Sequence, residues 1–376
     1  MDKNRGYWCV DNEYYDNKVK AIIGAQHREL GPKDITYHYN DQPWDQVDWS
    51  VEPSESLQEL YIKRARQLRE KYKTLILRFS SGADSTNILR TFVDNNIKLD
   101  VVTMNEWHEP GADSMLNTIN VEKKLLGKPL IEKLLEQGAT FKFIINNFSS
   151  TLGDAIGNDP AWIFDIDAPK FSCIDITAYR ALTTSEFDQW DDPTTGVIVG
   201  VDKPKIYCKE GKIWYFSMPD FLHSMHNVAN QMVPEPFYWT ADMPEIVIKQ
   251  SHVIKNFWRN HLDKLENTPD RVQSATSKTQ TIPLIYPNYY GQLDPFAEKL
   301  PYHDHDDINL KYRNGNSVAP RGWGWDWQFH KSPHFKVWKD GIDLADRLVD
   351  RKFKNKDSIW ENGLKIYHTK PRWIGK

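Results

Sequence analysis

The stretch from Leu75 to Leu89 constrains the fold of this chain more than any other, because a strand pattern and a helix pattern meet there. The segment 75–79 is mostly apolar and ends abruptly in small polar residues, which is typical of a short buried strand. Apolar residues then recur at helical spacing: Ile88, Leu89, Phe92 and Val93. A buried strand is therefore expected to turn directly into an amphipathic helix.

The turn between this strand and helix consists of four small residues: Ser80, Ser81, Gly82 and Ala83. Asp84 or Ser85 is expected to cap the helix by accepting its free backbone N–H groups. A tight turn of small residues that opens a helix suits an anion, above all phosphate, because N–H groups and the helix dipole point there. The alternative is an ordinary strand–turn–helix without a ligand. The sequence contains neither of the two commoner phosphate-loop motifs, Gly-x4-Gly-Lys-[Ser/Thr] and Gly-x-Gly-x-x-Gly.

The hexapeptide Ser80-Ser-Gly-Ala-Asp-Ser85 resembles the Ser-Gly-Gly-x-Asp-Ser signature of the PP-loop ATP pyrophosphatases, which also follows a strand. Ser81 stands where the family has its first glycine. A positive φ at that position is harder to reach for serine than for glycine, so the turn is expected to differ locally. The resemblance implies that these six residues bind the phosphates of ATP and that adenine lies near Met104.

Further strand and helix patterns alternate after the turn. Strands are expected at three places: 99–104, 141–145 and 196–201. Helical patterns separate them, and a helix at 57–71 with a capping box at Ser56 and Glu59 precedes the first strand. Alternation of this kind predicts a mainly parallel sheet whose ligands bind beyond the carboxyl ends of the strands. The family resemblance implies an α/β fold with a three-layer α/β/α, Rossmann-like (HUP-type) domain.

The resemblance to the PP-loop family covers about 54–262, which is therefore the expected PP-loop ATP-binding domain. Residues 1–53 are then an N-terminal extension, and 263–376 are a C-terminal extension rich in Trp and Pro. The two extensions are expected to hold helices near 17–30 and 341–354 and to pack on the central domain.

A second polar segment, Asp202-Lys203, follows the strand expected at 196–201. A parallel strand should end there on the ligand side, where Lys203 would neutralise phosphate charge and Asp202 would assist the metal or orient the substrate. A polar surface turn is the alternative. Gly200-Val-Asp-Lys-Pro204 and the segment 237–245 also resemble PP-loop proteins carried by tailed bacteriophages.

The PP-loop resemblance implies an AMP-forming ligase or transferase that splits ATP between its α- and β-phosphates and adenylates a small-molecule or nucleotide substrate, most directly for C–N bond formation. Catalysis is expected from Asp84, Asp202 and Lys203, and Asp84 is also the expected ligand of Mg²⁺. One alternative is a nucleotide-binding module that has lost catalysis. Another is a sulfur-transfer or sulfate-adenylate reductase-like enzyme, which the absence of a Cys-x-x-Cys pair disfavours.

The net charge of −4 gives no global basic field, so the composition does not indicate a nucleic-acid partner. The three cysteines are far apart, which fits a reducing compartment. The N-terminus lacks the apolar core of a signal peptide, and no apolar run approaches the roughly 20 residues of a membrane span. We therefore expect a cytoplasmic protein, in the host cytoplasm if a phage encodes it.

Three weaker patterns each have a functional interpretation and an ordinary structural one. The segment 303–307 carries His and Asp as a metal site would, but it reads as a solvated loop. The segment 313–327 combines charged and aromatic residues as a nucleic-acid stacking surface does, although aromatic packing under a long loop explains them more simply: Arg313, Arg321, Trp323, Trp325 and Trp327. Basic residues on the helix at 57–71 form either a solvated face or a surface for an acidic partner: Lys63, Arg64, Arg66 and Arg69.

Overall fold

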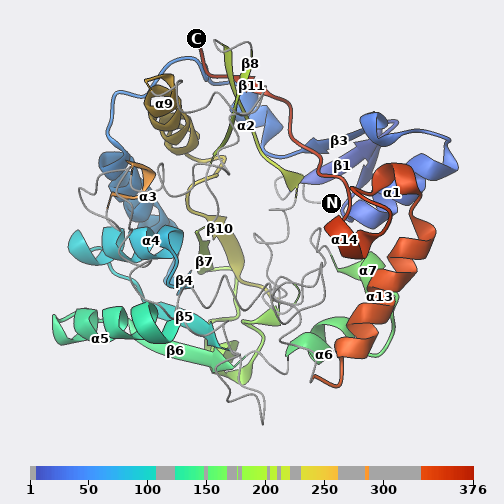
Figure 1. The fold of residues 1–376 in the computed structure, drawn as a ribbon. Helices are drawn as coiled ribbons and strands as arrows, with labels where there is room; N and C mark the ends of the chain where they lie inside the picture. Colours follow the sequence, from blue (N-terminus) through green and yellow to red (C-terminus); the bar gives the residue numbers. More distant parts are fainter. Residues whose placement is uncertain are drawn as a thin grey trace.

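The computed structural model describes most of the chain. The described residues are 6–106, 123–147, 151–166, 176, 180–200, 204–209, 213–220, 230–260, 284–287 and 332–376. They form three β-sheets and the helices that pack against them (Figure 1). Among the described helices, none combines the length and the apolar character that a membrane span requires.

A five-stranded parallel sheet lies at the centre of the fold (Figure 1). Its strands, in chain order, are β4 (Thr74–Arg78), β5 (Val101–Glu106), β6 (Lys142–Asn147), β7 (Thr195–Val199) and β10 (Val233–Pro236). All four pairings are parallel, and the spatial order is β10-β7-β4-β5-β6. The structure thus confirms a Rossmann-like α/β fold with a parallel sheet, and each of the four predicted strands overlaps one of these five.

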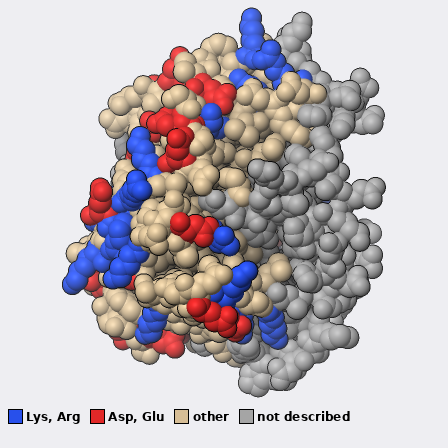
Figure 2. Space-filling view, turned by 90° about the vertical axis from the view of Figure 1, so that its left-hand side faces the viewer, with Lys and Arg blue, Asp and Glu red and all other residues tan. Residues whose placement is uncertain are grey.

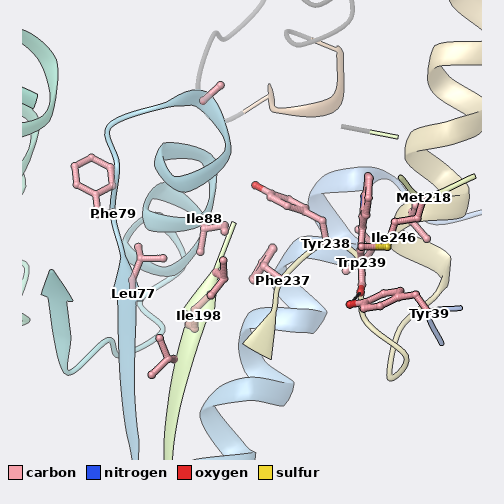
Figure 3. Packing of buried hydrophobic residues seen from close by; sticks show 14 of the residues in the cluster. Tyr39, Leu77, Phe79, Ile88, Ile198, Met218, Phe237, Tyr238, Trp239 and Ile246 are labelled. Carbon is pink, nitrogen blue, oxygen red and sulfur yellow. Dashed lines mark hydrogen bonds between the residues drawn. The ribbon is translucent and has the colours of Figure 1, made fainter. Parts of the chain in front are cut away.

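Helices cover this sheet, and its central strands are apolar on both faces for that reason. In Figure 1, one side of the sheet is covered by α3 (Leu57–Lys71), α4 (Ala83–Asp94), α5 (Lys128–Glu136) and α9 (Glu245–Arg259). On the opposite side lie, among others, α6 (Thr151–Ile156), α7 (Trp162–Asp165) and α13 (Phe335–Leu348). Between sheet and helices, side chains such as Leu77, Ile88 and Phe237 form the core (Figure 3).

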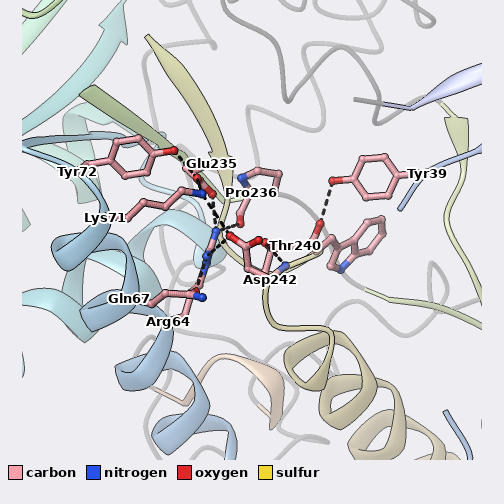
Figure 4. A network of polar contacts seen from close by, with 10 residues as sticks. Tyr39, Arg64, Gln67, Lys71, Tyr72, Glu235, Pro236, Thr240 and Asp242 are labelled. Atoms are coloured by element: carbon pink, nitrogen blue, oxygen red, sulfur yellow. Dashed lines mark hydrogen bonds and ion pairs between the residues drawn. The ribbon is translucent and has the colours of Figure 1, made fainter. Parts of the chain in front are cut away.

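Helix α3 begins with the predicted capping box. The Ser56 hydroxyl accepts from the Glu59 backbone N–H, and the Glu59 carboxylate accepts from the Ser56 N–H at 2.8 Å. The basic face expected on this helix is only partly solvated, however. Arg64 is fully buried and donates to Glu235 of β10 at 2.6 Å (Figure 4). The interpretation of Arg64 as a solvated charge is therefore wrong, because a carboxylate 171 positions later in the sequence pairs with it.

The outer surface of this helical layer carries charges of both signs, interspersed rather than gathered into one basic patch (Figure 2). Arg69, for example, pairs with Asp100 at 2.6 Å. A mixed surface of this kind does not favour the docking of an acidic partner on the exposed side of α3.

The N-terminal extension forms a small antiparallel sheet with the order β2-β1-β3. Its elements are β1 (Tyr7–Val10), β2 (Glu13–Tyr15), α1 (Lys18–His27), η2 (Pro32–Asp34), β3 (Ile35–His38) and α2 (Asp41–Asp45). The expected helix within 17–30 is present as α1, and the Asn17 side chain caps it by accepting from the N–H groups of Val19 and Lys20. A buried ion pair between Lys18 and Asp220, 2.8 Å apart, ties this extension to the rest of the protein.

The third sheet joins the hairpin β8 (Lys205–Lys209) and β9 (Ile213–Ser217) to β11 (Arg372–Trp373) near the C-terminus. The two hairpin strands pair antiparallel. The helix expected near 341–354 is present as α13 but lies earlier in the chain: it ends at Leu348, where Val349 takes an extended backbone, and a 3-10 turn follows at 351–353. The remaining described elements are η3 (Lys123–Gly127), η4 (Ser185–Trp190), η9 (Arg351–Phe353) and α14 (Ile359–Asn362).

Candidate functional site

The Ser80–Ser85 loop connects β4 to α4 at the place where the strand order of the parallel sheet reverses. From β4 the chain proceeds outward through β5 and β6, and it then returns to the other side of β4 with β7 and β10. Ligands of open α/β sheets bind at such a switch point, beyond the carboxyl ends of the strands. The loop predicted from sequence therefore occupies the position where this type of sheet binds its ligand.

The end of β7 lies against the same loop. A Cβ atom added to Gly200 would lie 3.4 Å from the Asp84 carbonyl carbon and 3.4 Å from the Ser85 backbone nitrogen. Strand β7 pairs with β4 in parallel register, so the chain after Val199 emerges beside the loop. The small size of Gly200 allows this close approach of two backbones.

Within the loop, Ser81 adopts a left-handed conformation with φ = 64°, and Gly82 is extended with φ = −74° and ψ = 168°. Helix α4 begins at Ala83, and Gly82 is its N-cap without a side-chain cap bond. The expectation that Asp84 or Ser85 caps the helix is therefore wrong. Both residues already lie in the first turn, because the helix starts directly after the extended glycine.

The Ser85 hydroxyl holds the loop closed. It accepts from the Ser80 backbone N–H at 3.2 Å and donates to the Gly82 carbonyl at 3.2 Å. By contrast, the backbone N–H groups of Ser81, Ala83 and Ser85 donate to no acceptor within the described part of the chain. Free N–H groups at the start of a twelve-residue helix fit a phosphate group well.

Ser81 takes a positive φ at the position where the PP-loop signature, which this loop resembles, has glycine. Its side chain is almost completely buried, and its hydroxyl donates to the Ser80 carbonyl at 2.5 Å. Gly127, just before α5, packs closely on it, since a Cβ there would lie 2.8 Å from the Ser81 Cβ and 2.7 Å from the Met104 Cε. The loop thus accommodates serine in a left-handed conformation beside a glycine of the next crossover.

We expect Ser81→Gly to raise the free energy of unfolding by up to about 1 kcal/mol. The substitution removes the cost of roughly 1–2 kcal/mol that a side chain incurs in the left-handed region, which exceeds the added freedom of glycine in the unfolded chain. Urea unfolding of the two proteins measures the difference. Gly82→Ala is the control, because Gly82 has a negative φ. A loss of stability in Ser81→Gly would show that the buried hydroxyl outweighs the backbone strain.

Two buried tyrosines, Tyr238 and Tyr286, form hydrogen bonds with Asp84. The Tyr238 hydroxyl donates to the Asp84 backbone carbonyl at 2.8 Å, and the Tyr286 hydroxyl hydrogen-bonds the Asp84 carboxylate. Figure 3 shows the Tyr238 ring reaching from its segment toward α4. Burial raises the pKa of both hydroxyls well above their usual range, so both stay protonated and can donate. Sequence reasoning missed both residues, although Tyr238 lies in the distinctive segment 237–245.

At the carboxyl ends of the neighbouring strands the structure adds polar groups that sequence reasoning also missed. Met104 is fully buried, and β5 continues past it to Asn105 and Glu106. Glu106 is 1% exposed and pairs with Lys128, at the start of α5, at 2.9 Å. The available signal was the pair of polar residues, Asn105 and Glu106, that directly follows Met104.

Asp202 and Lys203 lie outside the described residues, as do the segments 303–307 and 313–327. Asp84 is therefore the one predicted catalytic or metal-binding residue whose surroundings the structure describes. The described residues contain no group of three His, Cys, Asp or Glu side chains arranged to hold a metal. Magnesium bound to a nucleotide needs only one or two carboxylates beside the phosphate oxygens, so Asp84 alone fits that requirement.

Comparison with known proteins found no matching family model, no matching curated protein and no matching solved structure.

Proposed function

We propose that this protein is an ATP-binding enzyme of the PP-loop type, which cleaves ATP to AMP and pyrophosphate and adenylates an acceptor. The observation that supports this proposal best is the Ser80–Ser85 loop, which combines free backbone N–H groups with a position at the switch point of a parallel sheet. The acceptor is a small molecule or a nucleotide with a carboxylate or carbonyl oxygen.

In this proposal, backbone groups carry most of the phosphate binding. The N–H groups of Ser81, Ala83 and Ser85 bind phosphate oxygens, and the dipole of α4 favours their negative charge. Asp84 holds Mg²⁺, which supplies positive charge to the phosphates when it is bound. Preorganised donors of this kind stabilise charge that develops on the leaving pyrophosphate.

The proposed reaction has two steps. An acceptor oxygen attacks the α-phosphorus, the bond between the α-phosphorus and the bridging oxygen breaks, and pyrophosphate leaves with the electron pair. An amine or ammonia then attacks the adenylated carbon. A C–N bond forms between them, and AMP leaves. Lys203 follows the charge on pyrophosphate, and Asp202 orients the acceptor.

A nucleotide-binding module without catalysis is the second candidate, favoured by the serine at position 81 in place of glycine. Sulfur transfer is a weaker candidate, because the described Cys9 and Cys208 lie on β1 and β8, outside the parallel sheet.

Incubation with ATP labelled in the α-phosphate, together with pools of carboxylates and amines, separates the candidates. Production of AMP and pyrophosphate supports the enzyme, tight binding without turnover supports the module, and failure to bind ATP contradicts both.

We expect Asp84→Asn to weaken Mg-ATP binding, turnover or both at least tenfold and to leave the fold intact. An amide is a far poorer ligand for Mg²⁺ than a carboxylate, while its oxygen still accepts a hydrogen bond. Isothermal titration and pyrophosphate release measure the two effects. Asp94→Asn, at the other end of the same helix and paired only with Arg90 on the surface, is the matched control. Unchanged affinity and turnover in Asp84→Asn would remove Asp84 from the site.

A further inference from the structure

A short described segment of the C-terminal third, residues 284–287, contacts the Ser80–Ser85 loop through Tyr286 and Asp84. Its Ile285 and Tyr286 are fully buried. Neither the family signature nor the hydrophobic pattern assigns any role to this segment. Its contacts place it next to the first turn of α4, about 200 positions away in the sequence.

Two helices fix the backbone of this segment. The Tyr61 hydroxyl of α3 accepts from the Gln250 side chain of α9 at 2.9 Å, so its hydrogen is free to donate elsewhere. It donates to the Ile285 carbonyl at 2.5 Å. All the residues involved are buried, so this hydrogen bond is shielded from water and fixes the position of the segment.

The adjacent Tyr286 reaches Asp84. Its hydroxyl hydrogen-bonds the Asp84 carboxylate, and its ring packs against the Tyr238 ring with centroids 5.1 Å apart. Tyr238 accepts from Asn87 at 3.1 Å and therefore donates to the Asp84 carbonyl. One tyrosine thus holds the backbone of Asp84, and the other holds its side chain.

We propose that Tyr286 is a positioning residue for the Asp84 carboxylate and that segment 284–287 thereby couples the C-terminal third to the nucleotide loop. This inference rests on the proposed function, in which Asp84 binds Mg²⁺. A carboxylate already held in one orientation loses less conformational freedom when it binds a metal. Partners that orient metal ligands in this way change metal affinity by about 10–100-fold when they are removed.

The test compares Tyr286→Phe with Tyr39→Phe. Tyr39 is equally buried, and its hydroxyl donates to the Trp239 carbonyl at 2.9 Å, so its removal matches the loss of one buried hydroxyl away from the loop. Two quantities are measured: the Mg²⁺ concentration that half-saturates ATP binding, and hydrogen exchange of the amides at 83–90 without nucleotide. We expect Tyr286→Phe to raise the half-saturating Mg²⁺ concentration about tenfold and to accelerate hydrogen exchange at 83–90. Tyr39→Phe should change neither quantity.

The two readouts separate this inference from the proposed function. If the wild-type protein binds Mg-ATP and Tyr286→Phe keeps the same Mg²⁺ dependence, the positioning role is overturned while the proposed function stands. If the wild-type protein binds no ATP, the proposed function fails, and hydrogen exchange decides alone. Faster exchange at 83–90 in Tyr286→Phe then supports the coupling, and exchange equal to that of Tyr39→Phe overturns it.

Discussion

Replacement of Glu235 by glutamine is expected to lower the free energy of unfolding by about 3–5 kcal/mol, the usual cost of breaking a buried ion pair on one side. Arg64 is fully buried, and its guanidinium lies 2.6 Å from one Glu235 oxygen. The other oxygen accepts from Lys71 at 2.7 Å and from the Tyr72 hydroxyl at 2.6 Å (Figure 4). Glutamine would deprive the buried guanidinium of its nearest and only buried counter-charge among the described residues, and would turn one acceptor into a donor.

Asp242→Asn is the matched control for this prediction, because Asp242 belongs to the same network but is 40% exposed and lies 3.4 Å from both Arg64 and Lys71. Exposed pairs of this kind contribute about 0–1 kcal/mol. Urea unfolding followed by tryptophan fluorescence measures both variants. Equal losses in the two variants would show that solvent reaches the Arg64–Glu235 pair and that the network is not a buried anchor.

The central sheet could be predicted from the sequence because its strands are short apolar runs bounded by turn residues. The strand β10 could not, since Val233-Pro-Glu-Pro236 reads as a loop. Proline is tolerated there because β10 is an edge strand that pairs with only one neighbour, β7. Arg64 was misinterpreted for a related reason: its partner on β10 comes from a segment that the sequence pattern did not identify as a strand.

The place of the Ser80–Ser85 loop in the fold could be predicted, because the loop signature is local in sequence and the α/β alternation fixes which end of the sheet it occupies. The tyrosine contacts that position Asp84 were not predicted. Tyr238 and Tyr286 contact Asp84 from segments about 150 and 200 positions away, and hydrophobic periodicity carries no information about such contacts. The start of α4 was placed two or three residues too late for a local reason, because an extended glycine can precede a helix without any side-chain cap.

Substitution of Lys203 by methionine is expected to lower the rate of pyrophosphate release about 10²–10³-fold, equivalent to about 2.7–4 kcal/mol, and to weaken ATP binding far less. The position of Gly200 supports this prediction: Gly200 is the last described residue before Lys203, and its backbone lies against Asp84 and Ser85. A lysine ammonium is a compact charge on a flexible stem, which suits it to follow phosphate charge toward the leaving group.

A contact that strengthens only in the transition state affects turnover more than ground-state affinity, so the ratio of the two effects is the diagnostic quantity. Single-turnover pyrophosphate release and equilibrium ATP binding measure them separately. Lys209→Met removes the same charge from the exposed end of β8 and should change neither quantity. Near-normal turnover together with near-normal ATP binding in Lys203→Met would assign that lysine to an ordinary surface turn. Weaker ATP binding with an unchanged rate of release at saturating ATP would instead make it a ground-state ligand of ATP, because loss of a contact of constant strength lowers affinity without raising the chemical barrier.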